Sequence, residues 1–474
     1  MAILARMAGE GIGPFKSFDF DFSDQQGNPH PGPHIFAGIN GSGKSTVLRA
    51  LASVLRHSPS DGFQWQYWQH LTRGYEVTRL LAVIVLPGVE PFAVVQTSDR
   101  SKGWGERLSG WAKAMLSCGK VDSLKGVDWE SWLTDVLREG HKGWLEIGGP
   151  RNAHYWQSRM AVAGYGPSRR LQHLPEVNLS VRLETPREES LSFESTVQNE
   201  AIQSWLLGLF SKRAITKERG ENESKYSATL KRFEDALRLM CRQDVTFGVD
   251  IEPSLQPRLC MYGRRLDFSQ LPDGVRSTVG WLADFLMRMD MVNSQPEAIP
   301  SGVLLLDEVD AHLHPKWQRS ILPSIKEALP EVQVFATSHS PFVIASCPGA
   351  RIHVLDLDES GRATNRPPED APIGESLLAT MKDIFGVNSR FDIDTENLLE
   401  EWNRLRRSQA AGTISTRGAR RMEELRQILS SRSEELRQIV SPAVPLGESF
   451  IASLQSQADS LGRGQEPKQA SKRR

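Results

Sequence analysis

The sequence lacks the features that mark several specialised classes of protein. Only four cysteines occur among 474 residues, and they are scattered along the chain: Cys118, Cys241, Cys260 and Cys347. Their spacing argues against a disulfide scaffold and a cysteine-based metal motif. The most apolar stretch, residues 80–95, is interrupted by Pro87 and Pro91 and is too short to cross a bilayer. A membrane-spanning protein is therefore not expected.

An excess of one sign of charge is also missing. The 57 Lys and Arg residues nearly balance the 58 Asp and Glu residues, so no overall basic field predicts nucleic-acid binding. Charged residues make up 24% of the chain and apolar residues 39%, which is ordinary for a soluble globular protein. No signal-peptide pattern opens the sequence. We therefore expect a cytoplasmic protein that makes no membrane contact.

A phosphate-binding loop is the first positive signal. Residues 38–45 fit the pattern G-x-x-x-x-G-K-[ST], between a predicted buried strand at 34–37 and a predicted helix at 45–55. In such loops backbone N–H groups surround a phosphate at the helix N-terminus. The alternative is a glycine-rich turn that binds nothing. The predicted nucleotide contacts are Gly38, Asn40, Gly41, Gly43, Lys44, Ser45 and Thr46.

A second buried strand, predicted at residues 303–306, leads directly into Asp307 and Glu308. The carboxyl end of a parallel strand is where α/β proteins bind ligands, so both acids should lie beside the loop. We expect Ser45 and Asp307 to hold Mg²⁺, Asp307 through water, and Lys44 to reach the β- and γ-phosphates. Glu308 would polarise the attacking water. The alternative for the acidic pair is a helix N-cap.

Two further segments complete the predicted site. A strand at 332–337 is followed by His339, which would bond a γ-phosphate oxygen or, alternatively, serve a structural role. A turn at 271–274, containing Asp273 and Gly274, precedes an apolar helix predicted at about 276–289. The start of that helix is an anion site or the cap of a core helix.

These motifs, in this order, resemble the ATPase heads of the ABC class, of the SMC-like or RecF-like kind. The resemblance rests on the phosphate loop, on "LPDG" at 271–274, on "LLLDEVDAHLHP" at 304–315 and on "TSHSP" at 337–341. It implies an α/β fold in which a mixed sheet is flanked by helices. It also implies ATP and Mg²⁺ as cofactors.

In heads of this kind the turn with Asp273 and Gly274 is the signature motif, which contacts the γ-phosphate on a second subunit. Residues 310–314 occupy the position of the D-loop at the same seam. The resemblance therefore implies a homodimer that sandwiches two nucleotides, or a higher homo-oligomer. Here Pro272 stands where the family usually has serine, and proline supplies neither a hydroxyl nor an N–H. We therefore expect slow hydrolysis.

A narrower resemblance is carried by "YGPSRRL" at 165–171, "LPDGVRS" at 271–277 and the run at 304–325. These look like the ATPase subunits of Septu-type and retron-associated antiphage defence systems. That resemblance implies a sensor and regulator of a separate nuclease subunit, often of the HNH type. Two alternatives remain: a DNA-repair ATPase that binds DNA directly, and a nucleotide-dependent scaffold with little hydrolysis. Whether DNA or RNA is a partner stays open.

The segments between the motifs suggest a domain plan with two open alternatives. Eight of twelve tryptophans fall in residues 56–159, where a small satellite core is favoured over a base-stacking or partner surface. Residues 160–171 either reach the nucleotide, as a glutamine-loop equivalent, or form a tight turn with Arg169 and Arg170 in solvent. The predicted parts are an N-terminal lobe at 1–180 containing that tryptophan-rich insertion, a short helical arm at 181–245, a C-terminal lobe at 246–365, a helical region at 366–455 and a basic disordered tail at 456–474.

Overall fold

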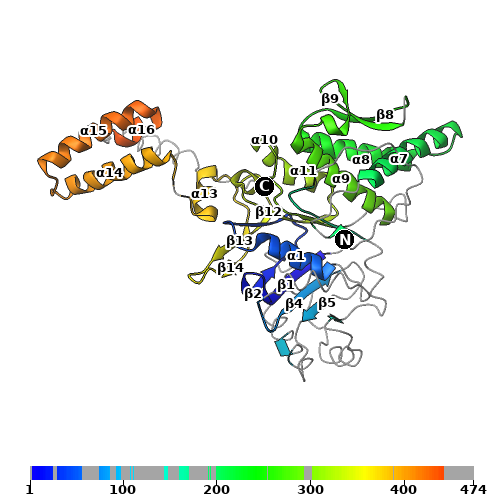
Figure 1. Cartoon of the computed structure of the whole chain (residues 1–474), viewed down its shortest axis with the longest axis horizontal. Coiled ribbons are helices and arrows are strands. Elements are labelled where there is room, and N and C mark those ends of the chain that lie inside the picture. Colours follow the sequence, from blue (N-terminus) through cyan, green and yellow to red (C-terminus); the bar gives the residue numbers. More distant parts are fainter. Residues whose placement is uncertain are drawn as a thin grey trace, which may run out of the picture. The chain divides into compact units, whose positions relative to one another are not determined.

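The computed structural model describes residues 3–24, 29–55, 74–85, 92–97, 107, 110–111, 144–147, 160–169, 190–191, 193, 199–252, 255–292, 302–387 and 389–441. The chain divides into two compact units, Met1–Val387 and Asn388–Arg474 (Figure 1). The helical region was predicted to start at residue 366. Its first helix, Leu377–Phe385, belongs to the first unit. Most of the tryptophan-rich insertion lies outside the described residues, including Trp65, Trp68, Trp104, Trp129, Trp132 and Trp156.

Five parallel strands form the part of the large sheet that carries the motifs. Their order across the sheet is β13 (Arg351–Leu357), β3 (His34–Gly38), β12 (Val332–Ser338), β11 (Gly302–Leu306) and β7 (Ala161–Tyr165). The three central strands are buried at every residue, as expected where helices cover both faces of a sheet. The predicted α/β fold with a mixed sheet is confirmed.

The other half of the sheet is antiparallel. It joins the parallel part through β14 (Ala363–Asn365), which pairs antiparallel with β13 and parallel with β2. A further short strand, β15 (Glu369–Asp370), pairs with β13. The antiparallel strands, in chain order, are β1 (Ile3–Ile12), β2 (Phe15–Asp21), β4 (Arg79–Val85), β5 (Phe92–Thr97) and β6 (Trp144–Ile147).

Along β2 buried and exposed residues alternate at the end of the strand. Phe18 and Phe20 are buried, as is Phe22 just beyond the strand, whereas Asp19 is exposed. The period of two residues places the aromatic rings on one face of the sheet.

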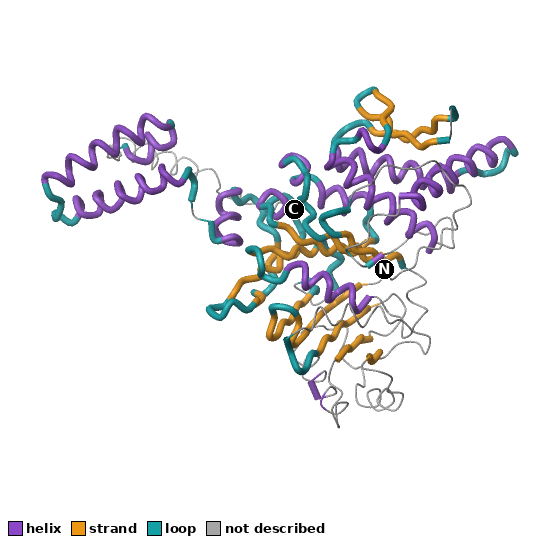
Figure 2. Tube along the Cα trace, in the orientation of Figure 1, coloured by secondary structure: helices purple, strands orange, loops and turns teal. Residues whose placement is uncertain are grey.

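Helices cover both faces of the sheet. Neighbouring residues of one strand point to opposite sides, so a strand that is apolar throughout needs cover on both faces. Leu304 of β11 belongs to one core cluster and Leu305 to the other. The helix α1 (Lys44–Leu55) packs into the cluster that contains the phenylalanines of β2. The opposite cluster takes residues from α7 (Asn199–Glu218), α8 (Ser224–Cys241), α9 (Asp273–Val292) and α11 (Ile321–Ala328) (Figure 2).

Shorter helices connect the strands at the site and end the first unit. They are the 3-10 turn η2 (Phe268–Gln270), α10 (Pro315–Gln318), α12 (Pro341–Ile344) and α13 (Leu377–Phe385). Among the described residues, none of the helices is long and apolar enough to cross a membrane.

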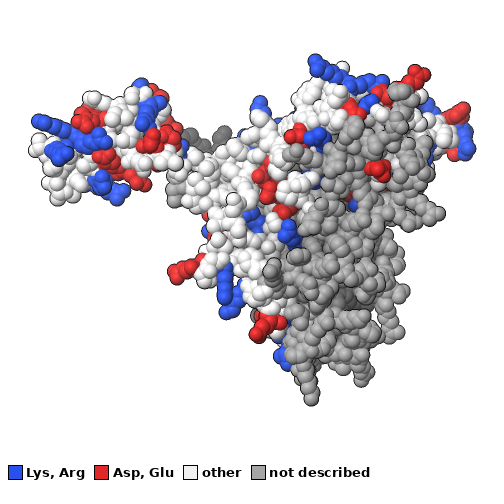
Figure 3. Space-filling view, viewed as in Figure 1, with Lys and Arg blue, Asp and Glu red and all other residues white. Residues whose placement is uncertain are grey.

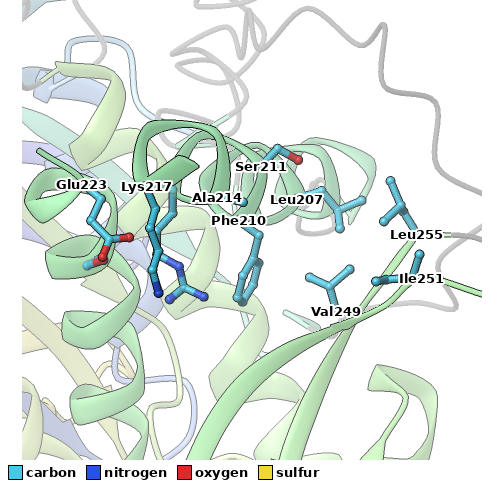
Figure 4. Close-up of a pocket in the computed structure, with 11 residues that line it drawn as sticks. Leu207, Phe210, Ser211, Ala214, Lys217, Glu223, Val249, Ile251 and Leu255 are labelled. Atoms are coloured by element: carbon cyan, nitrogen blue, oxygen red, sulfur yellow. The ribbon is translucent and has the colours of Figure 1, made fainter. Parts of the chain in front are cut away.

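The predicted short arm contains α7 and α8, which have 20 and 18 residues and are therefore about 30 Å long. A small antiparallel sheet of β8 (Val245–Asp250), β9 (Gln256–Met261) and β10 (Arg264–Leu266) lies beside them. A cavity of about 610 Å³ separates α7 from this sheet, with Phe210 and Val249 on its two sides (Figure 4).

The second unit is a bundle of three helices, α14 (Ile393–Ala410), α15 (Thr416–Arg432) and α16 (Glu434–Val440). Each helix begins after a residue whose side chain caps its N-terminus: Asp392, Ser415 and Ser433. Its own small core consists of Leu399, Trp402, Leu425, Leu429, Leu436 and Val440. The helices predicted in this part of the chain are confirmed.

Candidate functional site

The phosphate loop joins β3 to α1, and at two of its glycines there is no room for a side chain. Gly38 has φ 149°, and a Cβ there would lie 2.1 Å from the carbonyl oxygen of Leu355. Gly43 has φ 90°, and a Cβ there would lie 2.4 Å from the Phe15 ring. Gly41, in contrast, faces open space. The loop is thus packed tightly at its base and open at its tip, which is the shape that a phosphate needs.

The remaining residues predicted to contact the nucleotide lie at the tip of the loop and in the first turn of α1. Asn40 is exposed at the tip, and Thr46 packs against Gly13 in the first turn of α1. The ammonium of Lys44 donates hydrogen bonds to the carbonyl oxygens of Gly38, at 2.9 Å, and Ile39, at 2.7 Å.

Burial lowers the pKa of Lys44 to about 8, although the three acids that follow β11 oppose the shift. Only 6% of this side chain is exposed. A buried ammonium that is bonded to two carbonyls and faces carboxylates still carries its proton at neutral pH.

The acidic pair lies beside the loop. The hydroxyl of Ser45 donates to a carboxylate oxygen of Asp307 at 2.9 Å, across 262 positions of sequence. The hydroxyl of Thr337 donates to the same oxygen at 2.6 Å, which fixes the carboxylate from the other side. Because β3, β12 and β11 are parallel neighbours, all three side chains meet at one edge of the sheet.

Glu308 has an unusual backbone for a residue with a side chain, with φ 47°. Its N–H donates to the Thr337 hydroxyl at 2.7 Å, and the N–H of Val309 donates to the Thr337 carbonyl at 2.9 Å. These bonds hold the chain in a sharp turn as it leaves β11. Strained backbone of this kind concentrates at functional sites.

Arg169 lies beside the acidic pair, although the sequence alone assigned it no role in the site. Its guanidinium donates to the carbonyl oxygens of Gly166, at 3.1 Å, and Glu308, at 2.9 Å, and also to that of Asp307. Only 4% of the residue is exposed. Burial lowers the pKa of Arg169 to about 10, against the pull of the nearby acids, so the group stays charged.

Of the two alternatives for residues 160–171, a tight turn with two solvated arginines is therefore wrong for Arg169, while Arg170 lies outside the described residues. The burial of Arg169 follows from the position of β7 beside β11, since the chain that leaves β7 passes the acidic pair at the end of β11. The signal in the sequence was the arginine four residues after the end of a buried strand.

His339 follows β12 and is half-buried. Burial lowers its pKa, and the Lys44 ammonium lowers it further, while Asp310 opposes the shift. The imidazole is therefore neutral at pH 7, with one nitrogen able to donate a hydrogen bond. Asp310 is itself held by the Ser338 hydroxyl at 2.6 Å.

The predicted turn at 271–274 is in part helical. The helix α9 begins at Asp273, so Asp273 and Gly274 form its first turn, and our prediction of a start at about residue 276 is wrong. Pro272 limits the residue before it to extended conformations, and its carbonyl accepts the first helical hydrogen bond, from the N–H of Arg276 at 2.9 Å.

The start of α9 touches the predicted D-loop of the same chain. A Cβ on Gly274 would lie 2.7 Å from the carbonyl oxygen of His312, so only glycine allows this approach. Pro272, Asp273 and His312 are all exposed. The two segments that the resemblance assigns to a subunit seam therefore form one continuous surface.

Fold and site together define a P-loop α/β fold, with a glycine-rich loop, a neighbouring acidic pair and a histidine at one edge of a parallel sheet. Known proteins agree with this class. The family described as "AAA domain, putative AbiEii toxin, Type IV TA system" matches residues 262–345. The matched part contains α9, the acidic pair and His339 but not the phosphate loop.

Two curated relatives and one solved structure are similar to the chain. "Retron Vc95 probable ATPase" from Vibrio cholerae is 27% identical over 141 residues, which are 28% of this chain and 27% of the relative. "Septu protein PtuA" from Bacillus mycoides is 32% identical over 119 residues, 25% of this chain and 16% of the relative. The "SMC head domain from Thermotoga maritima" is 15% identical, covers 77% of this chain and 99% of that one, and has a TM-score of 0.40.

The chain thus spans less than a third of the length of either curated relative. The two sequence matches confirm the predicted relationship to ATPases of defence systems.

Proposed function

We propose that this chain binds ATP with Mg²⁺, hydrolyses it slowly, and acts as the sensor and regulator of a partner nuclease in bacterial antiphage defence. One observation carries the nucleotide part: the contact between Ser45, in the first turn of α1 after the phosphate loop, and Asp307, with Lys44 beside it. A hydroxyl and a carboxylate in contact are the hard oxygen ligands that Mg²⁺ prefers. Mg²⁺, when bound, supplies positive charge to the phosphates.

The chain's own residues have distinct roles in this proposal. Lys44 exchanges its two carbonyl acceptors for oxygens of the β- and γ-phosphates. Glu308 accepts a proton from the attacking water, and Arg169 holds the main chain on which Glu308 sits. The neutral His339 donates a hydrogen bond to the γ-phosphate.

The proposal includes a homodimer, or a higher homo-oligomer, with two nucleotides between facing subunits. Support comes from the exposed start of α9, which lies against His312: the N–H groups of a helix N-terminus suit a phosphate brought by a second subunit, and Arg276 in the same turn pairs with Asp273 and offsets its negative charge. The nuclease partner, expected to be of the HNH type, rests on the resemblance to Septu-type and retron-associated ATPases. The cytoplasmic location stays a prediction from the sequence.

Two variants separate binding from hydrolysis. Lys44→Ala removes a charged donor worth about 1.5–3 kcal/mol, so ATP affinity should fall about tenfold to a hundredfold. Glu308→Gln keeps size and hydrogen bonding but cannot take a proton; it should bind ATP as the wild type does, release no phosphate and accumulate as a dimer. Calorimetric titration, phosphate release and size measurement with ATP and Mg²⁺ check these outcomes.

The matched control is Arg49→Ala, an exposed cation on the same helix as Lys44, which should leave affinity unchanged. Unchanged affinity in Lys44→Ala would remove the phosphate-loop assignment. A Glu308→Gln protein that stays monomeric with ATP would remove the sandwich.

A further inference from the structure

The second unit carries an uneven distribution of charge. Residues 402–422 contain six arginines and no aspartate or glutamate: Arg404, Arg406, Arg407, Arg417, Arg420 and Arg421. The rest of α14, residues 393–401, carries acids and no arginine or lysine, and in the rest of α15 an arginine pairs with a neighbouring acid, as Arg426 does with Glu423 at 2.7 Å. We call this group of six the arginine tip.

The arginine tip surrounds the turn between α14 and α15. All of its members except Arg421 are exposed, and blue side chains are visible at the turn end of this unit, at the left of Figure 3. Arg404 and Arg407 are three residues apart on α14, and Arg417 and Arg420 are three apart on α15. Each pair therefore projects from one side of its helix.

Among the described residues, only one of these six arginines is paired with an acid. Arg421 pairs with Glu401 at 2.9 Å, and Arg406 lies over the Trp402 ring at 5.1 Å. Across the described part of the chain, in contrast, Arg407, Arg417 and Arg420 form no ion pair. Unpaired arginines at adjacent ends of two helices produce a local positive field in a protein whose overall charge is −1.

In α15 the arrangement opposes helix stability, whereas Arg407 lies in the last turn of α14, where a cation favours the helix dipole. Like charges three or four residues apart destabilise a helix by about 0.2–0.5 kcal/mol per pair. Cations in the first turn of a helix also oppose its dipole, and the first turn of α15 contains Arg417 and no acid. Residues that destabilise their own helix are characteristic of a functional surface.

The turn that presents these side chains is firmly built. The N–H of Thr413 donates to the Ser408 carbonyl at 2.9 Å, and the Ser415 hydroxyl caps α15 by accepting from Gly418 at 3.1 Å. A Cβ on Gly418 would lie 3.1 Å from the Ile414 side chain, so the turn packs closely. The arginines are thus held on a rigid support.

We propose that the arginine tip binds the phosphate backbone of a duplex nucleic acid, without reading its sequence. Guanidinium groups bind phosphate oxygens through paired N–H donors, and backbone contacts of this kind carry non-specific binding. Single-strand binders add exposed aromatic rings on which bases stack. The one aromatic residue at this end, Trp402, is buried in the bundle with 5% exposed. Phosphates are therefore the part of a nucleic acid that this surface can contact.

The test compares two triple variants of the full chain, measured without nucleotide so that the result does not depend on the ATP site. The first replaces Arg407, Arg417 and Arg420 with glutamine. The control replaces Arg426, Arg432 and Arg437 with glutamine, which removes the same charge at arginines that are paired with acids. The probe is a fluorescently labelled DNA duplex, with an RNA duplex in parallel, and anisotropy is recorded across a salt series.

We expect the tip variant to bind about tenfold or more weakly than the wild type. Its plot of log affinity against log salt should be shallower by about 0.9 for each phosphate that the variant no longer neutralises. The control should behave as the wild type, and thermal unfolding should show that both variants are folded. Equal binding by all three proteins, or an equal weakening in both variants, overturns the proposal. Binding of polyglutamate in preference to either duplex also overturns it, in favour of an acidic protein partner.

Discussion

At the scale of single residues, Arg169 stands out because its guanidinium supports the backbone of the site, a role that requires no contact with a nucleotide. Among the described residues it forms no ion pair; it donates to three backbone carbonyls, one just after β7 and two just after β11. The carbonyls of Asp307 and Glu308 are thereby oriented by a buried side chain. Arg169 is a positioning residue: it acts on the proposed chemistry through the backbone of Glu308.

We expect Arg169→Gln to reduce both stability and turnover. Unsatisfied buried carbonyls cost about 1–3 kcal/mol each, so the denaturation midpoint should fall. Phosphate release should fall more than ATP affinity, because Lys44 still binds the phosphates. Arg169→Lys should recover stability only in part, since an ammonium cannot reproduce the planar fork.

The control for this prediction is Arg366→Gln, at an arginine whose ion pair with Asp356 is largely exposed and therefore contributes little. Calorimetric titration with ATP and steady-state phosphate release give the two readouts. An Arg169→Gln protein in which affinity falls as much as turnover would show that Arg169 acts on binding rather than on the position of Glu308.

At the scale of secondary-structure elements, the start of α9 sets the expected rate of hydrolysis. Pro272 lies just before the first turn, is exposed and offers no N–H or hydroxyl to a phosphate from a facing subunit. Occupancy of the site would then act as a switch rather than as a motor.

Pro272→Ser should therefore raise turnover. A hydrogen bond to a charged acceptor is worth about 1.5–3 kcal/mol, which in the transition state is roughly tenfold to a hundredfold in rate. ATP affinity should change little, because the loop of the same subunit dominates binding. Phosphate release at saturating ATP measures the effect, and Pro367→Ser, at an exposed proline outside the site, is the control. Equal rates in wild type and Pro272→Ser would contradict the prediction.

The elements that the sequence predicted are those whose signals are local. A short apolar run with a glycine-rich loop or an acidic pair at its end identified β3 and β11. The start of α9 was misplaced because proline and glycine in "LPDG" suggest a turn, whereas proline also suits the entry to a helix. Arg169 could not be assigned, because its partners are 138 and 139 positions away and depend on strand order.

At the scale of the whole molecule, two buried histidines connect the beginning of the chain to its later part. The rings of His34 on β3 and His353 on β13 lie 3.2 Å apart, nitrogen to nitrogen, although 319 positions separate them. Neither is exposed to solvent. Burial lowers the pKa of His353 to about 3 and that of His34 well below its usual value, so both are neutral in the folded protein.

These histidines should make the first unit sensitive to acid. In the unfolded chain they titrate near 6.5, so below that pH only the unfolded state takes up their protons. The free energy of unfolding should then fall by about 1.4 kcal/mol per pH unit for each histidine as the pH drops toward 4. His353→Phe, which suits the surrounding phenylalanines, should flatten this dependence by one proton.

Urea unfolding at several pH values between 7 and 4 measures the dependence. His314→Gln, at an exposed histidine, is the control and should retain the wild-type slope. An unchanged slope in His353→Phe would mean that the buried pair does not govern acid stability.

The strand order described above also has a consequence for synthesis on the ribosome. The side chain of Gln333 holds the N–H of Leu4, 329 positions earlier, and β3 has a partner on each side only after β12 and β13 have emerged. At about 5–20 residues per second, the first strands wait roughly 15–65 seconds for these partners. Throughout that interval the phenylalanine face of β2 lacks its final cover. The nascent chain therefore has a complete phosphate loop in sequence long before it can possess a nucleotide site.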